Sequence, residues 1–235
     1  MTTSRHPKRT RITAGELIAQ REKDPIYLAR VQETEKQRRI AVEENFKELA
    51  PLLTELAVAG YKVRHPQELV RLFPRKEVIP ILLKWLPKLT RPDAKESVVR
   101  ALSVPWAKPI AAIPLIAEFR NAPDSMNTGL KWAIGNALEI VANDDVFNDI
   151  VELVRDKRHG KAREMLAVAL GNMKNPQAAD VLTDLLDDEE VVGHALIGLR
   201  ILKAKQARTR IELLINHPTA WIRKEAKRAL DKIGS

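Results

Sequence analysis

Hydrophobic positions recur with helical spacing along most of the chain, in short segments that come in pairs. The second segment of each pair contains a small residue followed by leucine. These dipeptides begin at Ala101, Ala137, Ala169, Gly198 and Ala229. Turn-forming stretches such as NAPDS at 121 and NHPT at 216 separate the pairs. A repeat built from two amphipathic helices predicts an all-α solenoid, in which each unit buries its apolar face against its neighbours.

Five helix pairs follow from this spacing, and no stretch alternates with the period of two that is typical of strands. We expect the pairs at about residues 76–104, 108–142, 145–174, 176–204 and 206–234. A sixth, degenerate pair would lie upstream, in LAPLLTELAVAGYKVRHPQELVRLF from residue 49. The pattern therefore predicts five to six helix pairs and almost no sheet.

The region before the repeats is also helical in pattern but more charged. Thr13 followed by Glu16 fits a capping box, and Asp24 before Pro25 fits a second helix start. The stretch QETEKQRR at 32–39 has no apolar residue, which predicts a helix exposed for much of its length. We therefore expect a basic disordered tail at 1–12, a charged helical extension at 13–45 and a repeat domain at 46–235.

Prolines occupy matching places in the first helices of successive pairs, at Pro51, Pro80 and Pro114. An interior proline removes a backbone donor and costs roughly 3 kcal/mol in an ordinary helix. We expect a break or kink close to each of the three, near the helix start, and straighter helices in the units without proline.

These patterns resemble HEAT repeats. The resemblance rests on the LxPLL-type proline of the first helices and on a VRxxA-then-AL pattern in the last second helix, carried by Ile222, Arg223, Ala226, Ala229 and Leu230. It covers about residues 45–234 and implies a right-handed, armadillo-like α-solenoid of about five to six HEAT-like helix pairs.

The same resemblance implies a ladder between units. An acid or amide in the turn would pair with an arginine at the start of the second helix, as in Asp156 with Arg163 and Asn216 with Arg223. The fourth unit has Gly193 and His194 at this place, which marks a position for a bend or a partner. Otherwise His194 is interpreted as a solvated histidine at a helix start.

Composition narrows the choice of function. The net charge of +9 is concentrated at the ends, because residues 1–12 carry +4 and residues 200–235 carry +7. The basic tail could contact nucleic acid or an acidic partner, or serve as a solubilising end, and the C-terminal helix could cap the array or bind phosphate. The absence of cysteine and of a long apolar stretch predicts a cytoplasmic protein without membrane segments.

No local motif indicates catalysis, a nucleotide site or a metal site, so we expect no enzyme activity and no cofactor. The acidic run at 187–190 is interpreted as favouring a helix dipole and solubility. Of the remaining aromatic residues, Trp85 is expected in the core, and Trp106 and Trp221 under loops.

Second helices of related arrays line the concave surface. In the second helix of the second pair, Trp132, Asn136 and Glu139 fall opposite the predicted core face. The same register in the other units selects Glu96, Arg100, Glu164, Val168, Ile197, Arg200, Lys224, Arg228 and Asp231. For Trp132, packing against the next unit is an equal alternative. We predict a partner-binding stripe that includes Arg100, Trp132, Asn136, Glu139, Arg200, Lys224 and Arg228.

Two functions fit this stripe. Its mixture of charges, apolar groups and tryptophan favours a non-catalytic adaptor or scaffold that binds a protein or peptide. The alternative is a nucleic-acid-binding protein that resembles the HEAT-like alkylpurine DNA glycosylases, whose aromatic and basic concave surface is matched by Trp132, Arg100 and Arg200. No aspartate of the central units matches their acidic position. HEAT-like bilin lyases are a third resemblance, which assigns no site residue.

Overall fold

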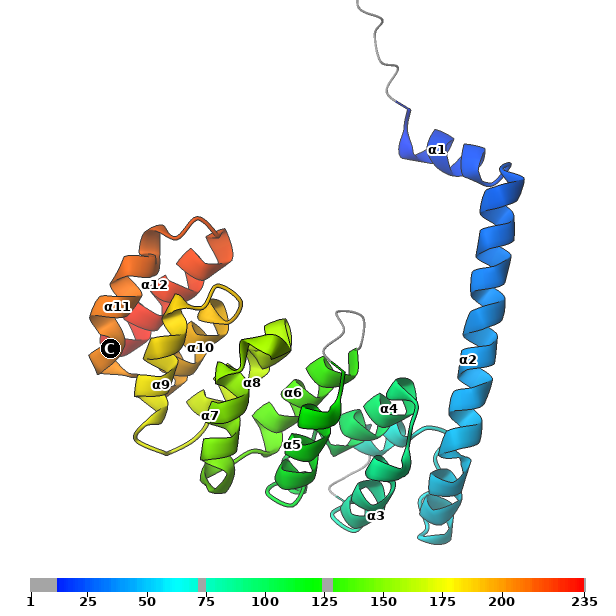
Figure 1. Ribbon diagram of the computed structural model, residues 1–235, viewed down its shortest axis with the longest axis horizontal. Coiled ribbons are helices and arrows are strands. Elements are labelled where there is room, and N and C mark those ends of the chain that lie inside the picture. The colour runs from blue at the N-terminus through cyan, green and yellow to red at the C-terminus, as the bar shows by residue number, and fades with distance from the viewer. Residues whose placement is uncertain (1–11, 72–74, 124–128, 235) are drawn as a thin grey trace, which may run out of the picture. The chain divides into compact units, whose positions relative to one another are not determined.

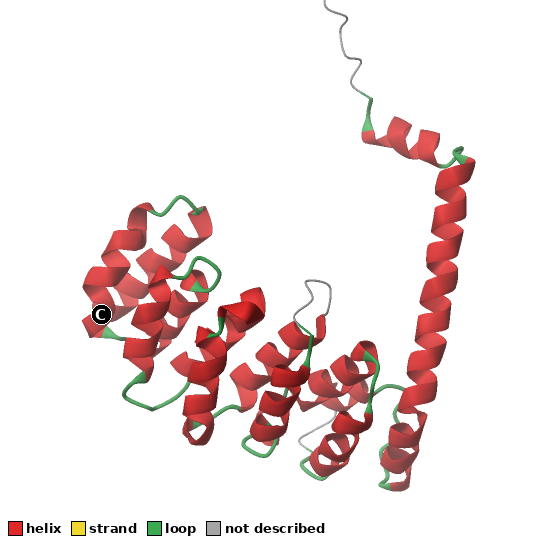
Figure 2. Cartoon of the chain, viewed as in Figure 1, coloured by secondary structure: helices red, strands yellow, loops and turns green. Residues whose placement is uncertain are grey.

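The computed structural model describes residues 12–71, 75–123 and 129–234, and every regular element in these residues is helical (Figure 1, Figure 2). The chain divides into two compact units, Met1–Lys47 and Glu48–Ser235. The first unit corresponds to the helical extension and the second to the repeat array. Within the described ranges, no helix combines the length and the apolar character needed to cross a membrane.

The extension consists of α1 (Ala14–Arg21) and the first part of α2 (Pro25–Val58). The Thr13 amide donates to Glu16 Oε2 at 2.9 Å and the Glu16 amide to Thr13 Oγ1 at 3.3 Å, which confirms the capping box. Asp24 Oδ1 accepts from the Ile26 amide at 2.9 Å where α2 begins. Residues 32–39 are all exposed, as predicted. The predicted disordered tail lies outside the described residues except for Ile12.

The array contains the five predicted helix pairs, and their positions are confirmed. The first helices are α3 (Val78–Trp85), α5 (Ala112–Asn121), α7 (Phe147–Arg155), α9 (Ala178–Asp184) and α11 (Arg208–Glu212). The second helices are α4 (Pro92–Leu102), α6 (Gly129–Val141), α8 (Glu164–Gly171), α10 (Val192–Leu202) and α12 (Ala220–Gly234). The architecture is an all-helical solenoid.

The sixth pair is incomplete. The last turns of α2 supply its first helix, with Leu49, Leu52 and Leu56 buried. Gly60, at φ +93°, reverses the chain while the Tyr61 amide donates to the Leu56 carbonyl at 2.8 Å, which is a glycine-terminated helix end. The second element is only a 3₁₀ helix, η1 (Pro66–Arg71), which packs on α4.

The prolines do not interrupt the helices. Pro80 and Pro114 are the third residues of α3 and α5, where backbone N–H groups have no partner within the helix, so the lost donor is not needed. The helices begin just before these prolines. Helix α2 continues through Pro51, so the break expected there is wrong. Because Pro51 is exposed, water can satisfy the carbonyl that the proline leaves without a donor.

The second helices form a continuous inner layer, since each packs on the next from α4 through α6, α8 and α10 to α12. Among the first helices, within the residues that the structure describes, only α5 and α7 pack on each other to more than a marginal degree. The backbones of α8 and α10 come close together, since a Cβ added to Gly171 would lie 2.5 Å from the Cα of Gly198. The more closely packed layer of a curved array lies on its inner side, so the second helices line the concave face.

Candidate functional site

The concave face exposes most of the predicted partner-binding stripe. Trp132 is 46% exposed, so it is not buried against the next unit. Arg100, Lys224 and Arg228 are exposed as well, and Asn136, Glu139 and Arg200 are half-buried. Val168, which the helical register also placed on the stripe, is buried instead. The reason is that α6 and α10 pack on both sides of α8.

Hydrogen bonds within the array hold the polar residues of this stripe in place. Arg100 Nε donates to Glu96 Oε1 at 2.8 Å, and Arg228 donates to Glu225 Oε1 at 2.6 Å. The Asn136 amide group donates to the Trp132 carbonyl at 2.8 Å. These contacts restrain the side chains, and restrained side chains lose less entropy in any binding event.

One bond on this face joins two units. Asn172, directly after α8, donates to Glu139 Oε1 of α6 at 2.7 Å. The predicted site residue Glu139 therefore also stabilises the stacking of the second unit on the third.

Trp221 packs across the gap between α12 and α10. A Cβ added to Gly193 would lie 1.9 Å from the Trp221 ring, so only glycine leaves room for it. The His194 ring centroid lies 5.2 Å from the indole. Trp221 stays 44% exposed, so the prediction that it packs under a loop is wrong. The Gly193–His194 position is instead where the tryptophan of the next unit is seated.

His194 is surrounded by protein and is not solvated, contrary to the sequence interpretation. Its side chain is 18% exposed, and its Nε2 lies 3.9 Å from Glu164 Oε2. Burial lowers the pKa of His194, against the opposing effect of the Glu225 charge. Burial also raises the pKa of Glu164. The neutral imidazole is therefore favoured at this joint.

Two shallow hollows bring basic residues together on the second-helix side of the array. One has a volume of about 380 Å³ and is lined by Arg200, Arg228, Asp231 and Lys232. The other, of about 350 Å³, is lined by Gln67, Val70, Arg71, Arg100 and Ser103. The predicted residues Arg200 and Arg228 thus share one site, while Arg100 belongs to another. Arg200 Nε is buried without a hydrogen-bond partner in the described structure.

The ladder between units exists, but its partners differ from those predicted. Arg163 is fully buried and donates to Asp188 of the next unit at 2.8 Å, to Glu190 at 2.7 Å and to the Val154 carbonyl at 3.0 Å. Asp156 instead pairs with Arg158. The predicted pairing of Asp156 with Arg163 is therefore wrong.

The second predicted pair of the ladder, Asn216 with Arg223, is also wrong. Arg223 donates to the carbonyls of His217 and Pro218 at 2.7 and 2.8 Å, so its bonds go to the turn backbone and not to the Asn216 side chain. This arginine therefore stabilises the turn of its own unit.

The acidic side chains at 187–190 contact basic residues of the preceding and the following unit, so this run connects three units. The sequence interpretation missed this role. Asp188 and Glu190 pair with Arg163 of the third unit. Asp187 pairs with Arg210 at 2.6 Å, and Glu189 lies 3.3 Å from Nε2 of His217, both in the fifth unit. Alternate acids of this run therefore reach opposite neighbours.

The packing of paired helices agrees with one family comparison. Residues 115–200 match the family model of HEAT repeats. No curated protein matches the chain. This match supports the resemblance to HEAT repeats over residues 115–200, and the helix pairs on either side continue the same solenoid.

Proposed function

We propose that this protein is a non-catalytic adaptor or scaffold that binds a protein or peptide on its concave face. HEAT repeats generally mediate protein interaction or scaffolding. The observation that carries the proposal is the pair of half-exposed tryptophans, Trp132 and Trp221, on second helices of the array. Tryptophan and arginine are the side chains most often responsible for affinity in protein interfaces.

The charge pattern favours a protein partner over nucleic acid. Arg100 and Arg228 are already paired with Glu96 and Glu225, and Asp231 lines the same hollow as Arg200. A surface that binds a phosphate backbone needs Lys and Arg side chains that are free to contact phosphates and displace the counterions of the nucleic acid. The glycosylase-like alternative therefore has less support than a mixed-charge peptide surface.

The titratable groups at the joint between units also favour a role without catalysis. The pKa values of His194 and Glu164 shift because neighbouring units bury these side chains. Packing of the repeats therefore accounts for both shifts without a catalytic role. A cytoplasmic location remains a prediction from the composition.

A capture experiment tests this proposal with the full chain as bait. We expect reproducible protein partners, and Trp132→Ala should weaken binding of the tightest one at least about thirtyfold. Leu213→Ala is the matched control, because Leu213 is 74% exposed on the 3₁₀ turn that extends the first helix of the last unit. Equal binding by Trp132→Ala, or capture only of nucleic acid with steep salt dependence, would contradict the proposal.

A further inference from the structure

The spacing of the buried leucines of α2 does not end where the array ends, and it defines a stripe along the helix that is partly apolar and partly charged. Toward the N-terminus of this helix, the positions that precede buried Leu49, Leu52 and Leu56 continue with alternating spacings of three and four residues. These positions are Leu28, Val31, Glu35, Arg38, Val42 and Asn45. The spacing is that of the a and d positions of a coiled coil, so the seven-residue pattern spans almost the whole helix.

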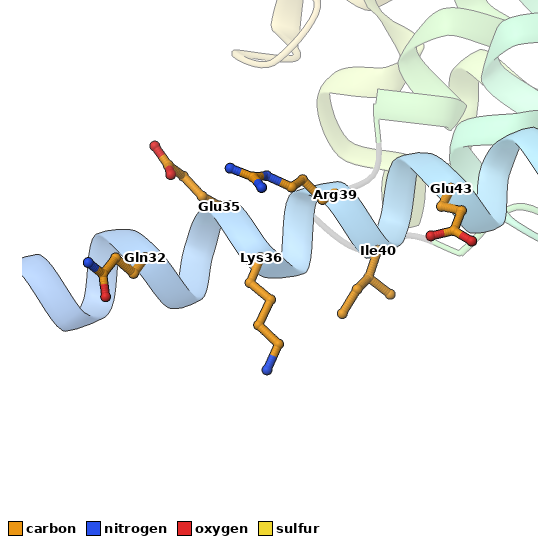
Figure 3. A pocket seen from close by; sticks show the side chains of 6 residues that line it. All are labelled: Gln32, Glu35, Lys36, Arg39, Ile40 and Glu43. Carbon is orange, nitrogen blue, oxygen red and sulfur yellow. The ribbon is translucent and has the colours of Figure 1, made fainter.

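This part of the stripe is exposed. Leu28 is 41%, Val31 36% and Val42 56% accessible, and Tyr27 and Phe46 widen the apolar face at its two ends. No described side chain between residues 12 and 48 is buried. Figure 3 shows a neighbouring hollow of the extension, and all six side chains that line it come from α2 alone. Most of the stability of helices in proteins comes from packing of an amphipathic face, so an element that covers this stripe would stabilise α2.

We propose that a second copy of this chain covers the stripe, through antiparallel pairing of the two α2 helices about a twofold axis between Glu35 and Arg38. In this register, Val31 lies opposite Val42 of the partner subunit, and Leu28 opposite Asn45 of the partner subunit. Each contact occurs twice, as a twofold interface requires. The stripe is therefore complementary to itself.

The two charged positions at the centre decide the orientation. Within the described part of the chain, neither Glu35 nor Arg38 forms an ion pair, although both occupy core positions of the seven-residue pattern. Antiparallel pairing places Glu35 opposite Arg38 of the partner subunit twice. Parallel pairing would place like charges opposite each other at both levels, which is unfavourable. A polar core position commonly fixes register and orientation in coiled coils.

The overall charge of the extension also permits self-association. Residues 12–47 contain seven Lys or Arg and seven Asp or Glu, so two copies carry no net charge to repel each other. The strongly basic segments of the chain lie elsewhere, in residues 1–12 and 200–235.

Charge exchange tests the pairing by sedimentation equilibrium on the full chain. We expect the wild type to be dimeric at micromolar concentration. Glu35→Arg and Arg38→Glu should each weaken the dimer by about a hundredfold or more, because each creates like-charged contacts. The double variant Glu35→Arg/Arg38→Glu should restore the dimer, and a mixture of the two single variants should form a heterodimer.

Lys36→Glu is the matched control, since it makes the same charge change as Arg38→Glu on the opposite side of α2. It should leave the dimer intact, and circular dichroism verifies that every variant keeps its helicity. A monomeric wild type at tens of micromolar, or equal dissociation of Lys36→Glu and Arg38→Glu, would overturn the proposal.

Disulfide trapping tests the orientation separately, because the sequence contains no cysteine. A mixture of Val31→Cys and Val42→Cys chains should form an intermolecular disulfide, whereas neither variant should do so alone. Efficient cross-linking of Val31→Cys with itself would show a parallel pair and refute the antiparallel register.

Discussion

Helix α2 carries one seven-residue pattern through two regions in which its side chains have different surroundings. In the array, Leu49, Leu52 and Leu56 are at most 1% exposed, whereas in the extension Val31 and Val42 are 36% and 56% exposed. The spacing is the same in both regions, although Glu35, Arg38 and Asn45 interrupt the apolar positions of the extension. The pattern alone therefore identifies the face but not its burial. Burial depends on the element that lies opposite, which in the array is supplied by neighbouring repeats.

Ion pairs differ between the two regions in the same way. In the array several of them join residues that are far apart in sequence, such as Arg163 with Asp188 and Arg120 with Asp149, in addition to pairs within one helix such as Arg100 with Glu96. In the extension, Glu43 and Lys47 pair within one helical turn and are largely exposed. Charges in the array therefore stabilise contacts between units, while this pair in the extension supports only its own helix.

The largest expected effect comes from breaking the buried ion pair between Arg163 and Asp188 in the array. Arg163→Ala removes the donor to Asp188, to Glu190 and to the Val154 carbonyl, and leaves a largely buried carboxylate without its partner. We expect a loss of about 3–5 kcal/mol in the free energy of unfolding, measured by urea titration. Lys47→Ala in the extension should leave the unfolding midpoint of the array unchanged. Similar unfolding midpoints for Arg163→Ala and Lys47→Ala would show that ion pairs of the two regions do not differ in their effect on array stability.

The second prediction compares the two halves of the α2 stripe directly. Leu52→Ala should cost about 2–5 kcal/mol of array stability, because Leu52 is fully buried and its removal leaves a cavity. Val42→Ala should change array stability by less than about 0.5 kcal/mol, since this valine is more than half exposed. Equal destabilisation by the two substitutions would show that the stripe is packed along its whole length within one chain.

The smallest expected effect is a pH dependence confined to the array. Burial lowers the pKa of His194 below its usual 6.5, so the unfolded chain takes up this proton first as the pH falls. Stability should therefore decline as the pH falls below about 6.5, and His194→Gln should reduce the slope. Burial lowers the pKa of His65 as well, so the difference between wild type and variant is the quantity to measure.

The extension provides the control for this pH dependence, because residues 12–47 contain no histidine. Its helicity should stay constant over the same pH range. An unchanged slope in His194→Gln would contradict the assignment of the pH dependence to this joint.

The sequence was sufficient to predict the helix pairs and both helix starts of the extension, while it left exposure and packing of Trp132 as equal alternatives. These features depend on residues close together in sequence, such as Thr13 with Glu16, or on the period of one helix. The family comparison at residues 115–200 supports the same architecture.

The contacts between units could not be predicted in this way. Arg163 has an aspartate in its own turn and another 25 residues later, and only the stacking of units decides that it bonds Asp188. Trp221 is seated on Gly193 of the preceding unit, and this contact depends on the space that a glycine leaves. The adjacent NHPT turn gave no indication of it.

The contact between Gly171 and Gly198 has a mechanical consequence. Because the backbones of α8 and α10 already touch there, this joint resists any bending that would narrow the concave face. Between α10 and α12 the spacer is the half-exposed side chain of Trp221, which rests on Gly193. Approach of the third and fourth units is thus limited by their backbones, whereas approach of the fourth and fifth units is limited by a side chain.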